Sequence, residues 1–167
     1  ANMDPGLMEK AAAYDAGNEH AIIWMWGTTG IGYNVNAVAE RLGPDAPVDS
    51  WALIFDPANA EKLADCGISM LDSSTDMLPS ALAYLGLDPT SSEPEDMEKA
   101  AELLASIRPF VRYFHSSQYI TDLANGEICV AVGYSGDMFI AAARAEEAGT
   151  GQEIAYSVPK EGAQQWF

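Results

Sequence analysis

The sequence predicts an α/β fold with a mostly parallel central sheet flanked by helices. Three observations favour this class. The chain has 167 residues, of which 49% are hydrophobic and 20% charged, so it can bury one substantial core. Short apolar runs typical of buried strands recur along it. Segments with helix caps lie between these runs, and alternating strands and helices are typical of a sheet covered by helices.

The helices are predicted from their start and stop signals. Asp4 followed by Pro5 is a cap with proline in the first turn, and Gly43-Pro44 and Asn125-Gly126 are pairs that end helices. Between Met77 and Leu85 the apolar residues fall on one helical face. The expected helices cover 5–14, 35–42, a short one over Trp51–Phe55 capped by Ser50, 57–63, one reaching Leu85 and capped by Asp72 or Ser73, 94–108, one reaching Asn125 and capped by Ser116 or Ser117, and 136–148.

The strands are predicted from continuous apolar runs between these helices. EICVAVG (127–133) gives the clearest signal, and AIIWMW (21–26) also reads as a buried strand. IGYN (31–34) is expected to be a short strand or a turn. The remaining strands cover 67–71, 110–116 and 154–158, and Trp166 ends a further one.

The charge of the chain is strongly acidic. Eight basic residues against 25 acidic ones give a net charge of −17. Nucleic acids and anionic membrane surfaces bind basic proteins, so we expect neither as a partner. An acidic field raises the local concentration of cations and suits a cationic ligand, although a solvated acidic surface would give the same composition. No apolar stretch reaches the 18 or so residues of a membrane span, so we expect no membrane insertion.

The two cysteines, Cys66 and Cys129, leave two interpretations open. They are too few and too far apart for a zinc site. They are either two buried free thiols or a disulfide, and a disulfide would indicate an oxidising compartment.

The segment VGYSGD (132–137) nearly matches the nucleophile elbow G-x-S-x-G of serine hydrolases. Ser135 stands at the nucleophile position, but Asp137 replaces the second glycine. A hydrolase also needs a histidine base, and the two histidines, His20 and His115, both precede the serine. A serine hydrolase is therefore a minor alternative, and we expect no catalytic residue.

Cofactor motifs are also incomplete. GTTGIG (27–32) has its glycines in the wrong order for a dinucleotide loop, and the segment from Asp72 to Asp76 lacks the pattern of a calcium loop. We expect neither a cofactor nor a metal.

A binding site for a cation fits the same residues better. Tyr134 and Asp137 lie three positions apart across a strand-to-helix turn, and in α/β sheets ligands bind beyond the carboxyl ends of strands. Asp76 follows the strand at 67–71, and Trp166 ends another strand. Aromatic faces attract ammonium groups and carboxylates bind them, which suits a linear polyamine. The alternative is that both aspartates only cap their helices.

Four segments give the sequence a family resemblance. WGTTGIGYNVNAV (26–38), APVDSW (46–51), RYFHSSQYITDLANGEICVAVGYSGD (112–137) and SVPKEGA (157–163) resemble the periplasmic putrescine/spermidine-binding proteins of bacterial ABC importers. The resemblance runs from about Asn2 to Phe167.

The resemblance implies a site of four residues. Asp76 stands where the family usually has Glu, whose longer side chain pairs with an amine. Tyr134 stands where Trp is common and would stack on the aliphatic chain. Asp137 would be an amine-binding carboxylate, and Trp166 an aromatic wall.

The resemblance also implies an architecture and a function. Residues 1–167 would be a single α/β lobe of a two-lobed protein, most of its second lobe, with the first lobe and the C-terminal segments absent. The terminal pair Trp166-Phe167, which lacks a polar tail, suggests the same, and the next acid of the family would follow it. GTTGIG would be a structural turn near the crossover between lobes, and the disulfide of the family matches Cys66 and Cys129.

We therefore expect a monomeric periplasmic protein that binds putrescine or spermidine and delivers it to an ABC transporter permease. A sensor that uses the same lobe for regulation is the alternative among binding proteins.

Overall fold

The computed structural model describes residues 3–167, which form two compact units. One unit comprises the described residues up to Gly27 together with Gln165–Phe167, and the other comprises Thr28–Gln164. The first contains helix α1 (Pro5–Ala11), the 3₁₀ turn η1 (Ala16–Asn18) and the short strand β6 (Gln165–Trp166). The second contains the sheet and the remaining helices.

The sheet has the strand order β3-β2-β4-β1-β5. Strand β2 runs parallel to β3 and β4, whereas β1 runs antiparallel to both of its neighbours, β4 and β5. The predicted α/β class is confirmed, with parallel pairing on one side of the sheet and antiparallel pairing around β1. The strands are β1 (Gly27–Asn34), β2 (Ile68–Met70), β3 (Val111–Phe114), β4 (Val130–Tyr134) and β5 (Ile154–Ser157).

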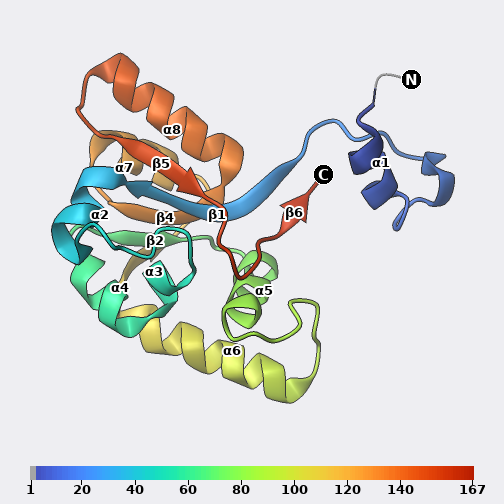
Figure 1. The fold of residues 1–167 in the computed structure, drawn as a ribbon, viewed down its shortest axis with the longest axis horizontal. Coiled ribbons are helices and arrows are strands. Elements are labelled where there is room, and N and C mark those ends of the chain that lie inside the picture. The colour runs from blue at the N-terminus through green and yellow to red at the C-terminus, as the bar shows by residue number, and fades with distance from the viewer. Residues whose placement is uncertain (1–2) are drawn as a thin grey trace. The chain divides into compact units, whose positions relative to one another are not determined.

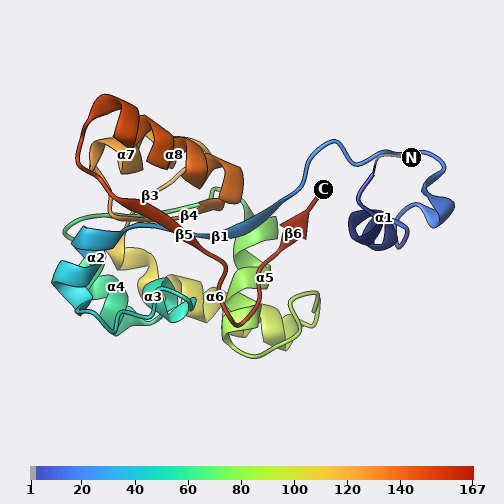
Figure 2. The same cartoon turned by 45° about the horizontal axis from the view of Figure 1, so that its top comes forward.

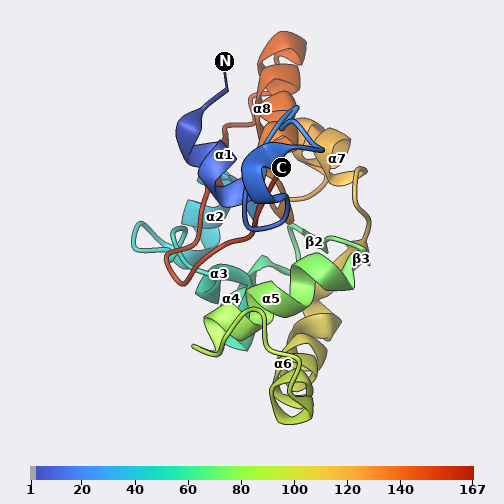
Figure 3. The ribbon, with the colours of Figure 1, turned by 90° about the vertical axis from the view of Figure 1, so that its right-hand side faces the viewer.

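Helices cover both faces of this sheet. Figures 1 and 2 show α7 and α8 on one face and α2, α3, α4 and α6 on the other, and Figure 3 shows the same division from the side. The helices are α2 (Val35–Leu42), α3 (Ala52–Phe55), α4 (Pro57–Leu63), α5 (Ser74–Tyr84), α6 (Pro94–Ile107), α7 (Tyr119–Asn125) and α8 (Ser135–Ala148), with a 3₁₀ turn η2 (Arg108–Phe110) after α6.

The core lies between the sheet and these helices. Strand β4 is buried along Val130–Val132, and Trp51 is fully buried and stacks on Phe55 with 5.4 Å between ring centroids. The indole Nε1 of Trp51 donates to the carbonyl oxygen of Gly162 at 2.8 Å, which fixes the loop after β5 to the start of α3. Burying aromatic side chains of this size contributes much of the stability of a small core.

Most predicted helix ends are confirmed. Helices α2 and α4 have the predicted bounds, and Gly43 caps the end of α2. The first helix begins at Pro5, where the Asp4 carboxylate accepts from the Leu7 N–H at 3.0 Å, but it ends at Ala11 rather than near Tyr14.

The predicted serine cap of α7 is wrong. The imidazole Nδ1 of His115 accepts instead from the backbone N–H groups of Ser117 and Gln118, at 3.1 and 3.0 Å. A side-chain acceptor is required there because the first N–H groups of a helix have no partner within it.

Two predictions near the start of the sheet are also wrong. AIIWMW (21–26) is neither helix nor strand, and Trp24 is 89% exposed. GTTGIG is not a turn but belongs to β1. Its glycines allow close approach: a Cβ at Gly30 would lie 2.5 Å from the Ser157 carbonyl oxygen and from the Tyr156 hydroxyl.

A disulfide joins Cys66 to Cys129, with 5.5 Å between their Cα atoms. This confirms the pairing that the family resemblance implies. Cys66 follows α4 and Cys129 precedes β4, where its N–H donates to the Gly67 carbonyl oxygen at 3.0 Å. The bond therefore ties a helix of one layer to the central part of the sheet.

Replacing both cysteines by alanine should lower the free energy of unfolding by about 4 kcal/mol, because the disulfide closes a loop of 63 residues in the unfolded chain. Urea denaturation followed by circular dichroism measures the loss. Dithiothreitol should lower the midpoint of the wild type and leave that of the double variant unchanged. Equal midpoints for the oxidised and reduced wild type would contradict this role.

Candidate functional site

The candidate site is formed where β2 and β4 end. These strands are parallel neighbours, with Ile68 opposite Val130 and Ser69 opposite Ala131, so their carboxyl ends lie at the same edge of the sheet. Helix α5 begins shortly after β2, and α8 begins directly after β4. Each carries an aspartate in its first turn, Asp76 and Asp137 respectively. The sheet therefore brings together two carboxylates that lie far apart in the sequence.

Asp76 accepts hydrogen bonds from three hydroxyl groups. Its Oδ1 accepts from Thr29 Oγ1 at 2.8 Å, and its Oδ2 accepts from Ser73 Oγ at 2.5 Å and from the phenol of Tyr134 at 3.3 Å. The carboxylate thus joins β1, the start of α5 and the end of β4.

Asp137 is held from the buried side by a residue that the sequence did not indicate. Tyr119, fully buried in α7, donates its hydroxyl to Asp137 Oδ2 at 2.5 Å. The hydroxyl oxygen of Tyr119 in turn accepts from the backbone N–H of Tyr134 at 3.2 Å. Burial, and then the bond to Asp137, raises the pKa of the Tyr119 phenol well above its usual value, so this group remains a neutral donor.

Tyr134 lies between the two carboxylates. It is half-buried, its phenol donates to Asp76, and its backbone N–H donates to Tyr119. Burial raises the pKa of the Tyr134 phenol, and the charge of Asp76 raises it further, so the group stays protonated at neutral pH. Three of the four predicted site residues, Asp76, Tyr134 and Asp137, therefore belong to one connected network.

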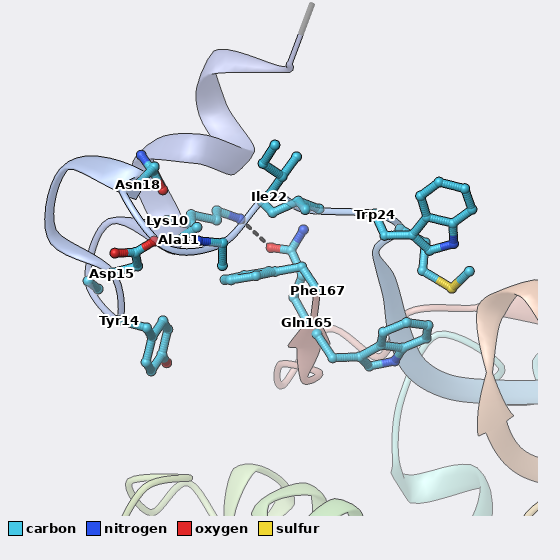
Figure 4. Close-up of a pocket in the computed structure, with 14 residues that line it drawn as sticks. Lys10, Ala11, Tyr14, Asp15, Asn18, Ile22, Trp24, Gln165 and Phe167 are labelled. Atoms are coloured by element: carbon cyan, nitrogen blue, oxygen red, sulfur yellow. Dashed lines mark hydrogen bonds between the residues drawn. The ribbon is translucent and has the colours of Figure 1, made fainter.

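The fourth predicted residue, Trp166, belongs to the other compact unit, so its place beside these three stays a prediction. In its own unit, Trp166 lines a cavity of about 930 Å³ with mostly apolar walls (Figure 4). Lys10 is also in this wall and donates to Gln165, and the rings of Tyr14 and Phe167 meet edge to face at 6.2 Å.

This cavity is a poor site for a cation. The carboxylate of Asp15 in its wall already accepts from the backbone N–H groups of His20 and Ala21, both at 2.9 Å. These bonds lower the pKa of Asp15, and the first of them contributes most. Lys10 adds a positive charge to the same wall.

The serine of the VGYSGD segment has a structural partner. Ser135 Oγ accepts from the backbone N–H of Thr28 at 3.2 Å. The Nδ1 of His115 already accepts from the N–H groups at the start of α7. Within residues 3–167, no hydrogen bond joins Ser135 to a histidine. The arrangement lacks the serine–histidine pair that a hydrolase requires.

Two features of other classes of protein are absent from residues 3–167. No helix there is both long and apolar enough to cross a membrane. No group of three or more His, Cys, Asp or Glu side chains within residues 3–167 is arranged to hold a metal ion.

The glycine before Tyr134 is required by the packing of the site. A Cβ at Gly133 would lie 2.6 Å from ring atoms of Tyr119 and from the Met138 methyl group. Both neighbours are buried, so neither can move away freely. Gly133 thus allows the Tyr119 ring to lie directly against β4, where its hydroxyl reaches both Asp137 and Tyr134.

Gly133→Ala should lower the free energy of unfolding by about 1 to 3 kcal/mol, the usual cost of overpacking a core. The matched control is Gly136→Ala, three residues later, where an added Cβ meets open space. That control should be neutral or stabilise by up to about 1 kcal/mol, because alanine favours a helix. Urea denaturation compares the two, and equal effects would show that the close contact with Tyr119 is not required.

The chain is similar to known proteins. The family model described as "Bacterial extracellular solute-binding protein" matches residues 2–167. The chain is 54% identical over 166 residues to the putrescine-binding periplasmic protein SpuD of Pseudomonas aeruginosa, and 52% identical over 167 residues to the putrescine-binding periplasmic protein PotF of Escherichia coli. Each alignment covers 99% of this chain and 45% of the relative, so the chain spans about half the length of these relatives.

Solved structures share the fold. A putative spermidine/putrescine ABC transporter protein of Listeria monocytogenes superposes with a TM-score of 0.76 at 27% identity, over 99% of this chain and 45% of that one. The spermidine/putrescine substrate-binding protein PotD of Streptococcus pneumoniae gives a TM-score of 0.78 at 23% identity, over 99% and 46% of the two chains.

Proposed function

Because the chain belongs to the family of bacterial extracellular solute-binding proteins, with a match over residues 2–167, we propose that it binds a polyamine such as putrescine or spermidine. The bound polyamine is delivered in the periplasm to the permease of an ABC importer. The chain binds and does not catalyse. The names of its relatives support this function, since SpuD and PotF are both called putrescine-binding periplasmic proteins.

The observation that carries the proposal is the network at the ends of β2 and β4. Asp137 is an anion in the first turn of α8, and Tyr134 is a half-buried aromatic ring next to it. An ammonium group needs an anion, and the methylenes between two ammonium groups need a flat apolar surface. The net charge of −17 further favours a cation over an anion.

We also propose that residues 1–167 form most of one lobe of a two-lobed protein. The 45% coverage of the relatives supports this architecture. The second lobe would close over the ligand and supply the remaining contacts, and the closed form would signal to the permease. Trp166 would be an aromatic wall of the complete site.

The chain alone should therefore bind putrescine weakly. One charge-assisted hydrogen bond and one aromatic contact supply about 2 to 5 kcal/mol together, which corresponds to a Kd of about 0.2 mM or weaker. A titration followed by amide NMR should shift the resonances of Gly133–Asp137. The neutral analogue 1,4-butanediol should leave them in place, because it lacks the charges.

Two variants make the titration specific. Asp137→Asn should weaken putrescine binding about ten-fold or more, the effect of removing a charged partner. Glu147→Gln is the matched control: it removes an exposed acid from the other end of α8 and should change the Kd by less than about two-fold. Equal effects of the two variants would mean that the net negative charge of the chain attracts putrescine and that Asp137 is not a specific binding residue. Sub-micromolar binding by the chain alone would contradict the two-lobe proposal.

A further inference from the structure

We propose that the two carboxylates of the site have different roles: Asp76 is a positioning residue that holds the phenol of Tyr134, and Asp137 takes the ammonium group. The inference rests on the polyamine-binding function proposed above. It gives Asp76 a different role from the amine-pairing Glu that the family usually has at this position.

The hydrogen bonds of Asp76 carry the inference. A carboxylate offers about four acceptor positions, and neutral hydroxyl groups of Thr29, Ser73 and Tyr134 already occupy three of them. Thr29 is fully buried, so its bond is made from inside the fold. An ammonium group at Asp76 would have to share or displace these donors, and a displaced buried hydroxyl would lose its partner at a cost.

The position of Asp76 is fixed on its backbone side as well. Ser80 Oγ donates to the Asp76 carbonyl oxygen at 2.8 Å, within the first turns of α5. The residue is therefore anchored by its own helix and by β1, and its carboxylate serves as a fixed point to which the phenol of Tyr134 is bound.

Asp137 differs from Asp76 because fewer acceptor positions of its carboxylate are occupied. Within residues 3–167 its hydrogen-bond donor is Tyr119, which reaches Oδ2 from the buried side, and no Lys or Arg forms a salt bridge with it. Asp137 is only partly buried. Its Oδ1 thus keeps its acceptor positions for a ligand, and Tyr119 orients the group.

Tyr134 transmits the effect of Asp76. The residue is held at two points, by Asp76 at the phenol and by Tyr119 at the backbone N–H. A ring fixed in this way presents its face without the entropy cost of ordering it on binding. Removing Asp76 should therefore weaken ligand binding only when Tyr134 has a phenol hydroxyl that Asp76 can hold.

A double-mutant cycle tests this dependence. The Kd of putrescine is measured by NMR for the wild-type chain, Asp76→Ala, Tyr134→Phe and the double variant. We expect Asp76→Ala to weaken binding about three- to ten-fold in the wild type and less than about two-fold in the Tyr134→Phe background, since residues acting as a unit are not additive. A loss of ten-fold or more in both backgrounds would mean that Asp76 contacts the amine directly and would overturn the inference.

The control variant is Asp122→Ala. Asp122 also accepts from a tyrosine phenol, that of Tyr113 at 2.6 Å, but belongs to no predicted site. The Asp122→Ala variant should leave the Kd within about two-fold of the wild type, because the tyrosine that Asp122 holds lies outside the site. Circular dichroism verifies that each variant is folded, and Asp76→Asn replaces Asp76→Ala in the cycle if the alanine variant is unfolded.

A second readout needs no ligand. With tyrosines labelled at the ring Cζ, a pH titration by NMR gives the pKa of each phenol. The pKa of Tyr134 should fall in the Asp76 variant, because the carboxylate that raises it is gone. If the wild type binds no putrescine, the polyamine function fails, and an unchanged Tyr134 pKa would separately overturn the positioning role.

Discussion

The parallel pairing of β2 with β4 is the constraint on which the site depends. It places the carboxyl ends of both strands at one edge, so the first turns of α5 and α8 come together there. The aspartate in each first turn is favoured by the helix dipole, which makes these positions suitable for anions even without a ligand. The fold thus places two carboxylates at the same edge of the sheet, and the surrounding hydroxyl groups determine what each can bind.

Tyr119 shows which part of the site sequence reasoning could not find. The motif VGYSGD placed Tyr134 and Asp137 correctly at the end of a strand, because strand and helix signals meet within six residues. Tyr119 lies on another helix and looked like an ordinary core aromatic. Its role depends on which side chains it touches in three dimensions. A signal was present in Gly133, since a glycine inside an apolar strand often marks a close approach.

The errors in the predicted fold have a similar cause. Helix ends such as Gly43 and Pro57 were predicted well because caps and prolines act locally. The run AIIWMW reads as a buried strand by composition, but burial depends on whether another segment covers it. The family resemblance predicted a turn at GTTGIG, yet Gly30 and Gly32 lie in a strand where neighbouring side chains fill the space of a Cβ. The family resemblance, not residue spacing, predicted the disulfide.

The most direct test of the account is an intermolecular NOE experiment on the labelled chain with putrescine. If the edge formed by β2 and β4 is the cation site, the methylene protons of putrescine should give NOEs to the ring protons of Tyr134. NOEs confined to Trp24 or Phe167, which line the cavity of the other unit, would place the ligand away from both aspartates and contradict the central claim.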